Sequence, residues 1–178
     1  MSVIERSPRI ETRRLALRAP TMSDAGRIAA LANDLGVARM TTRLPHPYLR
    51  GDADAFLARM AALDYAREAV FAIELEQEGP IGVVGLHPSG SFAPEIGYWL
   101  GRPYWGRGFA TEAARAALVW AHKGWGRRHV HARHFSDNPA SAEVLCKVGF
   151  LYTGEVRLLP SRARGGEAVP SRMMVWLA

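Results

Sequence analysis

The feature of this chain that most constrains its fold is a glycine-rich turn between an apolar strand and an alanine-rich helix. The turn lies within residues 97–113, "GYWLGRPYWGRGFATEA", which carry four glycines and one proline ahead of the helix. Glycine allows the backbone to approach a ligand closely, and the free N–H groups at a helix N-terminus attract phosphate. We therefore expect the amides of residues 106–111 to form a phosphate cradle, with an ordinary strand-to-helix connection as the structural alternative.

Two well-known phosphate loops fit this turn poorly. A Walker A loop requires a lysine followed by Ser or Thr after its second glycine, and no lysine follows here. A dinucleotide fingerprint would need a small residue without a hydroxyl where Thr111 stands. It would also need an acidic residue in the next strand, which offers only basic and apolar residues. Hydrolysis of ATP or GTP and NAD-type chemistry are therefore disfavoured.

The periodicity of the remaining chain predicts an α/β (α+β) domain with a mixed, largely antiparallel sheet. Alternating and β-branched runs predict strands at residues 14–20, 69–76, 81–87, 91–100, 128–135, 150–159 and 170–178. Residues 41–50 and 160–169 contain prolines or glycines and are expected to be loops.

Apolar stripes and capping residues predict four helices. The first carries a stripe that ends at Leu35, and Asp52 is expected to cap the second. The third is expected over residues 110–122, with its end near Gly124. Asn138 is the expected N-cap of the fourth helix, because a proline follows it at the first helical position.

Length and composition indicate one globular domain over residues 1–178, of which 48% are hydrophobic. No apolar run reaches the roughly 20 residues that a membrane-spanning helix needs. The charged N-terminus lacks the apolar segment of a secretory signal, so we expect a cytoplasmic protein with no membrane partner. Cys146 is the single cysteine and excludes an internal disulfide.

Basic residues exceed acidic ones and give a net charge of +6, with 21 arginines and two lysines. A basic surplus can bind nucleic acid, but these arginines are scattered along the chain, which disfavours a nucleic-acid partner. His129 and His131 lie on one face of an expected strand at a spacing that metals accept. No carboxylate or cysteine stands close to them in sequence, and we therefore expect no metal site.

Two segments together resemble the central motifs of the GNAT superfamily of acetyl-CoA-dependent N-acetyltransferases. They are "PEIGYWLGRPYWGRGFATEAARAALVWA" and "SDNPASAEVLCKVGF", in this order. The opening "IETRRLALRAP" resembles the branch that includes ribosomal-protein N-terminal acetyltransferases. The resemblance covers nearly the whole chain. It implies a GNAT-like sheet with helices on both faces, acetyl-CoA as the acyl donor and a homodimer.

The resemblance also implies which residues hold the cofactor. The pyrophosphate loop would consist of Trp105, Gly106, Arg107, Gly108, Phe109, Ala110 and Thr111. Trp105 departs from the Gln or Arg of the superfamily, which a loop that binds through backbone N–H groups tolerates. Pantetheine would pair with the backbone of Trp99, Leu100 and Gly101 like an added strand. Asn138 and Ser141 would complete the cofactor site from the second motif.

Three residues are candidates for catalysis. Many relatives protonate the leaving thiolate with a tyrosine, but Leu145 stands at that position. Ser141 is the acid that the resemblance suggests for this branch, and a capping or cofactor contact is its alternative. Glu95, acting through water, is the first candidate for the base, with an ion pair to an arginine as its alternative. His134 is the second candidate, with a structural role in its strand as the alternative.

The expected reaction is direct transfer of an acetyl group to a primary amine. A protein N-terminal α-amine is one acceptor, and a small amine such as a metabolite or an antibiotic is another. A domain that binds acyl-CoA without catalysis, or one that binds nucleic acid, remains as an alternative. The acceptor cleft is expected along residues 41–56, where Arg43, His46, Tyr48 and Arg50 would favour an acceptor with negative charge.

Overall fold

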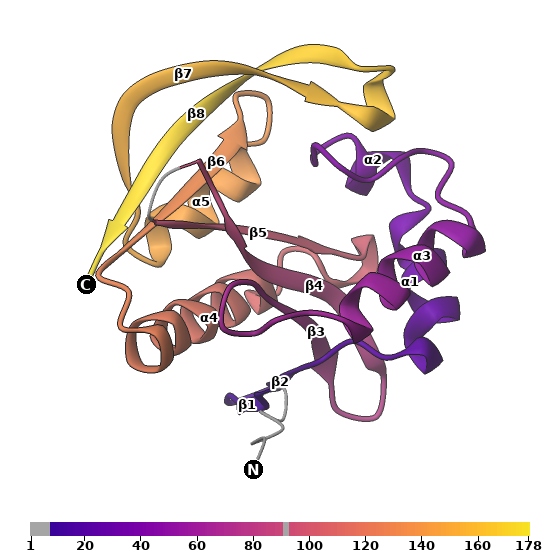
Figure 1. The fold of residues 1–178 in the computed structure, drawn as a ribbon. Helices are drawn as coiled ribbons and strands as arrows, with labels where there is room; N and C mark the ends of the chain where they lie inside the picture. The colour runs from indigo at the N-terminus through magenta and orange to yellow at the C-terminus, as the bar shows by residue number, and fades with distance from the viewer. Residues whose placement is uncertain (1–7, 91–92) are drawn as a thin grey trace.

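An eight-stranded sheet forms the centre of the computed structural model, which describes residues 8–90 and 93–178 (Figure 1). The strands are β1 (Ile10–Glu11), β2 (Leu15–Arg18), β3 (Ala69–Leu75), β4 (Gly79–Pro88), β5 (Pro94–Leu100), β6 (His129–Phe135), β7 (Leu151–Ser161) and β8 (Glu167–Leu177). They lie in the order β1-β2-β3-β4-β5-β6-β8-β7, and only the pair β5–β6 is parallel within this described part. The mixed, largely antiparallel α/β fold is confirmed.

Helices cover both faces of this sheet. They are α1 (Ala25–Ala32), α2 (Leu35–Ala38), α3 (Arg50–Ala61), α4 (Phe109–Trp125) and α5 (Pro139–Lys147), with short 3-10 turns at Met22–Asp24, Arg102–Tyr104 and Arg162–Arg164. None of the helices in the described part of the chain has the length and apolarity that crossing a lipid bilayer demands. The expectations for residues 1–7 and for Ser91 and Phe92 lie outside the described residues.

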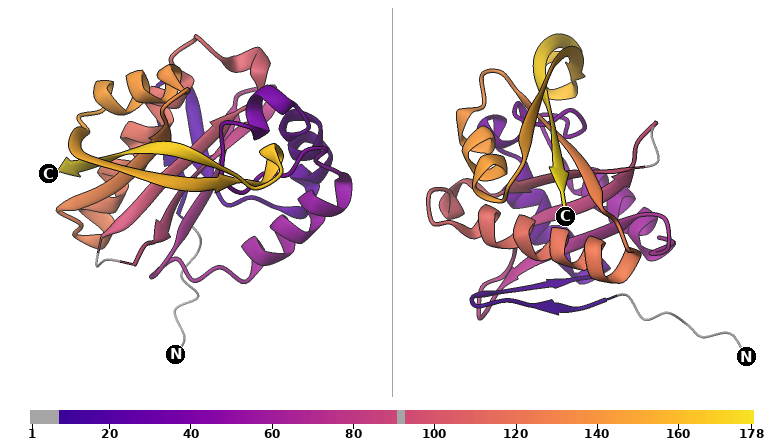
Figure 2. Two further views of the ribbon diagram at one scale, coloured as in Figure 1. Left: turned by 90° about the horizontal axis from the view of Figure 1, so that it is seen from above. Right: turned by 90° about the vertical axis from the view of Figure 1, so that its left-hand side faces the viewer.

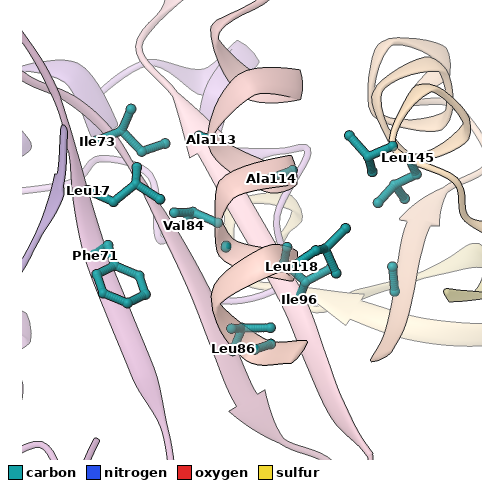
Figure 3. Packing of buried hydrophobic residues seen from close by; sticks show 14 of the residues in the cluster. Leu17, Phe71, Ile73, Val84, Leu86, Ile96, Ala113, Ala114, Leu118 and Leu145 are labelled. Carbon is teal, nitrogen blue, oxygen red and sulfur yellow. The ribbon is translucent and has the colours of Figure 1, made fainter. Parts of the chain in front are cut away.

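The main core lies between α4 and one face of the sheet. Alanines allow the helix to approach closely, so Ala113 and Ala114 are fully buried beside Leu118. They pack against Val84 and Ile96 of the two central strands (Figure 3). Burial of this apolar surface is the main stabilising contribution to the fold.

The opposite face of the sheet carries α3. Met60 of this helix packs with Val70 and Val83, and Trp99 lies partly buried beside them. Because side chains alternate along a strand, residues 83, 85 and 87 of β4 lie on this face. The same alternation places residues 95, 97 and 99 of β5 there, opposite their partners on β4.

Three local expectations were wrong. Leu35 is 48% exposed and does not belong to the stripe of α1; it begins α2, whose first N–H groups Asp34 caps. Asp52 is the third residue of α3 and accepts the Leu49 N–H at 2.8 Å, so it acts from inside the helix. The third expected helix does not end near Gly124, because the left-handed residue that ends α4 lies two positions later.

Half of the segment expected as a loop at residues 160–169 is strand. β7 and β8 pair as far as Ser161 and Glu167, and glycines with positive φ complete the tight turn after Arg164. The hairpin arches above the rest of the sheet and brings its tip beside α2 (Figures 1 and 2). There, Thr41 O accepts the Ser161 hydroxyl at 3.1 Å, and Thr42 O accepts the Arg162 N–H at 3.3 Å.

Candidate active site

The candidate site lies where the parallel strands β5 and β6 separate. Over their described residues the two strands share one register pair, Glu95 with His131. Toward Leu100, β5 continues its pairing with β4 on the other side. A cavity of about 720 Å³ opens here, and its lining extends from the glycine turn to Arg133. This volume is typical of a small-molecule site.

The glycine turn contributes one end of the cavity. Gly106 and Gly108 have φ values of 70° and 79°, which side chains with a Cβ rarely adopt. Gly108 is the N-cap of α4 and offers no side chain to its first N–H groups. These residues line the cavity together with Phe109, Ala110 and Thr111. The turn therefore has the geometry of an anion cradle at a helix N-terminus.

A polar contact from the start of the chain holds this cradle in place. Glu112, in the first turn of α4, accepts hydrogen bonds from the Thr12 hydroxyl at 2.6 Å and from Arg14 Nε at 2.7 Å. Arg14 also donates to the carbonyl of Arg107 at 2.9 Å. The side chain of Arg107 lies over the ring of Phe109. Sequence reasoning missed Arg14 and Glu112, because their partners are distant in sequence.

Arg102 supports the end of β5 beside the cradle. Arg102 forms two hydrogen bonds of 2.6 Å to Asp34, and these hold the pKa of that carboxyl at about 2. Its guanidinium lies over the ring of Trp105, whose Nε1 donates to Leu100 O at 2.8 Å. Trp105, which stands where the superfamily has Gln or Arg, therefore anchors the end of β5 next to Gly101.

The second motif faces β5 across the cavity. Asn138 accepts the Ser141 N–H at 3.1 Å and is the N-cap of α5, as the sequence predicts. The Ser141 hydroxyl lies 3.0 Å from the Tyr98 hydroxyl. Burial raises the pKa of Tyr98 to about 12, although its hydrogen bond with Ser141 acts in the opposite direction. Sequence reasoning missed Tyr98. The alternation of side chains along "GYWLG" places Tyr98 on the face of the strand opposite Trp99, and this signal could have identified it.

A row of four polar side chains crosses the sheet at the other end of β5. Arg133 on β6 lies 3.2 Å from Glu95, which is the strand partner of His87 on β4. The Nδ1 of His87 lies 2.6 Å from the carboxylate of Glu68, just before β3. We call Glu68, His87, Glu95 and Arg133 the polar row; all but Glu68 line the cavity.

The sequence model of the family described as "Acetyltransferase (GNAT) domain" matches residues 14–151, a range that contains the cradle, the second motif and the polar row. The chain belongs to the GNAT acetyltransferase family. It is accordingly an acyltransferase enzyme of the N-acetyltransferase class.

Relatives and solved structures agree with this membership. The chain is 30% identical over 154 residues to the uncharacterised N-acetyltransferase YoaA of Bacillus subtilis, covering 84% of this chain and 86% of that protein. The ribosomal-protein-S5-alanine acetyltransferase of Vibrio fischeri has a TM-score of 0.81 at 22% identity, covering 96% of each chain. The microcin C7 self-immunity acetyltransferase MccE, solved with acetyl-CoA and AMP, has a TM-score of 0.81 at 17% identity, covering 94% of each chain. The last two likenesses show that the GNAT fold is shared.

Leu145 and His134 have structural contacts in this GNAT enzyme. Leu145, at the position of the common tyrosine, is 1% exposed and belongs to the core. His134 lines the cavity but is 6% exposed, and both ring nitrogens have partners. Nδ1 lies 2.9 Å from Phe135 O, and Nε2 lies 3.0 Å from the hydroxyl of Tyr152. These contacts leave His134 less suited than the polar row to take a proton.

The expected acceptor loop of the GNAT enzyme contributes Arg43 to the cavity lining, beside Leu44. Tyr48 instead packs into the core between α1 and α3, and Arg50 pairs with Asp54 at 3.0 Å. Within residues 8–90 and 93–178, no cluster of three or more His, Cys, Asp or Glu residues is suited to hold a metal ion.

Proposed function

We propose that this GNAT enzyme transfers the acetyl group of acetyl-CoA to the α-amine of a peptide N-terminus. The observation that carries the proposal is one continuous cavity whose lining includes both the amide cradle and most of the polar row. One end suits the phosphates of a nucleotide, and the other offers a carboxylate to an amine. An α-amine has a pKa near 8, so a useful fraction is neutral at physiological pH, whereas a lysine amine near 10.4 is almost fully charged.

The donor fits along β5. The pyrophosphate would accept hydrogen bonds from the amides of residues 106–111 at the start of α4. Pantetheine would pair with the backbone of Trp99, Leu100 and Gly101, on the edge of β5 that has left β6. The thioester would then lie between Tyr98 and Glu95, within reach of Ser141. Asn138 supports this arrangement because it fixes the first turn of α5.

The proposed chemistry places one proton acceptor and one proton donor along this strand. Glu95 would remove a proton from the acceptor amine through water, after which the amine attacks the thioester carbonyl. Ser141, hydrogen-bonded to Tyr98, would protonate the departing thiolate. Holding both substrates along one strand supplies proximity, which is a large part of the rate enhancement.

A small amine is the second candidate acceptor. Ser161 and Arg162 hold Thr41 and Thr42, which line the cavity, and a wall fixed in this way would favour a compact acceptor. Both kinds of acceptor appear in the names of solved structures: a ribosomal-protein alanine in one and spermidine in another.

The test combines binding with turnover. Calorimetric titration with acetyl-CoA should show saturable binding, and release of CoA thiol should then be measured with panels of short peptides and small amines. The proposal expects higher kcat/KM for peptides with a free α-amine than for the same peptides with a blocked N-terminus and a free lysine. A preference for small amines would favour the second candidate, and binding without thiol release would indicate a sensing domain. No binding at millimolar acetyl-CoA would overturn the proposal.

A further inference from the structure

The pair Glu68 and His87 in the polar row has no role in the chemistry described so far. The Glu68 carboxylate lies 2.6 Å from Nδ1 of His87 and also accepts a hydrogen bond of 3.2 Å from Arg59 of α3. Both side chains of the pair are about four-fifths buried, at 19% and 21% exposed. A carboxylate that accepts the Nδ1 proton fixes the imidazole tautomer and leaves Nε2 as a proton acceptor.

The imidazole lies over a part of the sheet that has no side chains of its own. Gly85 of β4 and Gly97 of β5 are register partners, and both line the cavity. A Cβ atom at Gly85 would lie 2.5 Å from Nε2 of His87, so the ring occupies the space above this glycine. At Gly97 the corresponding space is open. Nε2 is therefore on the cavity floor, and the described residues form no hydrogen bond to it.

Glu95 and His87 are placed to share a proton. The Glu95 carboxylate lies 3.2 Å from Arg133. An imidazole is ordinarily a stronger base than a carboxylate, so a proton that reaches Glu95 can pass on to a neighbouring imidazole. His87 is its direct partner across the strands, where Cβ atoms are about 5 Å apart.

We propose that Nε2 of His87 is the final acceptor of the amine proton and that Glu68 is its positioning residue. This inference rests on the proposed function and adds a second proton acceptor to it. The amine nitrogen bonds to the carbonyl carbon, the C–S bond breaks, and its electron pair leaves on sulfur. The amine proton passes through water and Glu95 to Nε2, while Nδ1–H stays bonded to Glu68. The imidazolium then returns its proton to solvent through the cavity.

The charges around His87 suit this role. Burial lowers the pKa of His87, its hydrogen bond to Glu68 opposes that change, and the positive charges of Arg43 and Arg59 lower it further. Glu95 faces the ring from β5 and favours the imidazolium once it forms. The net pKa lies below the ordinary 6.5, so the ring is neutral at physiological pH and can accept a proton.

The experiment compares His87→Gln with His129→Gln, an exposed histidine on β6 outside the cavity. Thermal melting and acetyl-CoA titration should first show that both variants fold and bind the donor. With a peptide acceptor, His87→Gln should lower kcat about 10²-fold at pH 7, with an unchanged KM for acetyl-CoA. The loss should shrink toward pH 9 as the α-amine, with a pKa near 8, loses its own proton. His129→Gln should match the wild type throughout.

Two further variants test whether the position of the His87 ring matters, and not only its presence. Glu68→Gln keeps the ring but removes the charge that orients it, and should lower kcat by about tenfold. Gly85→Ala keeps both residues and displaces the ring, and should reproduce most of the loss in His87→Gln. Added imidazole should partly restore His87→Ala but not Glu95→Gln.

The inference is overturned if folded, donor-binding His87→Gln keeps the wild-type kcat and pH profile. A loss that is equal at every pH, with a raised KM for either substrate, would also overturn it, since that is the mark of a structural role. If the wild type itself transfers acetyl to no amine, the proposed function has failed. If it transfers acetyl and His87→Gln does so equally well, this inference alone has failed.

Discussion

The hydroxyl of Tyr98 on β5 lies 3.0 Å from the hydroxyl of Ser141 in the first turn of α5. This bond joins the two elements that border the cavity, and both residues are partly buried. Because the pKa of Tyr98 is raised to about 12, the phenol stays protonated across neutral pH and can supply a hydrogen bond to Ser141. The two groups should therefore act as one unit.

The first prediction concerns this unit. Ser141→Ala and Tyr98→Phe should each lower kcat by about tenfold. This loss is smaller than the loss usual for removal of an acid catalyst, because a thiolate is a good leaving group. The double variant should lose no more than either single variant, since effects of groups that act together are not additive. Thiol release at saturating acetyl-CoA measures this. Independent, multiplying losses would contradict the paired role.

The second prediction concerns Glu95. Glu95→Gln should lower kcat about 10²-fold near pH 7 and recover partly at high pH, where more of the acceptor amine is neutral. The pH dependence of kcat/KM from pH 6 to 9.5 measures this, with Glu11→Gln on β1 as a control carboxylate, paired to Arg9 at the surface. A profile of the same shape as the wild type would remove Glu95 from the proton path.

The third prediction concerns the cradle. Gly108→Ala forces a side chain into a φ of 79° and should destabilise the protein by about 1 kcal/mol. It should also raise the Kd for acetyl-CoA at least tenfold, because the amides of the turn shift. The matched control is Gly51→Ala in α3, where a Cβ meets nothing within 4 Å. The control should leave the Kd unchanged and stabilise the protein by about 0.5 kcal/mol. Equal Kd values in the two variants would argue against the cradle.

The fourth prediction concerns stability in acid. Asp24 is 5% exposed; burial opposes its charge, but hydrogen bonds from Arg18 and the Thr21 amide outweigh burial and lower its pKa. A lowered pKa in the folded state contributes stability above the ordinary value of 3.8, and this contribution is lost as the pH falls through the folded pKa.

Asp24→Asn should therefore lower the free energy of unfolding by about 2 kcal/mol at pH 7. The difference from the wild type should shrink as the pH falls below 3.8. Urea unfolding at pH 7 and pH 3 measures both. Asp54→Asn, which breaks an exposed pair in α3, should change stability by no more than about 0.5 kcal/mol. A difference that stays constant with pH would contradict the ionic origin.

Local signals in the sequence predicted much of the fold and part of the site. The N-cap Asn138 and the glycine turn depend on neighbours within a few residues, so they could be identified without tertiary structure. The same local reasoning failed for Asp52 and Gly124, where more than one nearby residue could end or begin the helix.

The polar row could not be predicted from local signals, because it depends on the register between strands. His87 and Glu95 become neighbours only once β4 and β5 pair with Gly85 opposite Gly97. Glu68 joins them through a third strand. The structural alternative for Glu95 is an ion pair to an unspecified arginine, and the 3.2 Å contact with Arg133 shows that such a pair forms.

The contact between the β7–β8 hairpin and Thr41, which lines the cavity, has a consequence for the order of folding. Ser161 and Thr41, which bond there, are 120 positions apart in the chain, whereas the glycine turn and α4 are contiguous. Closing a long loop costs more chain entropy than forming a local turn, so such contacts tend to form late. A nascent or partly unfolded chain can therefore possess the glycine turn and its helix while this wall of the cavity is still unformed.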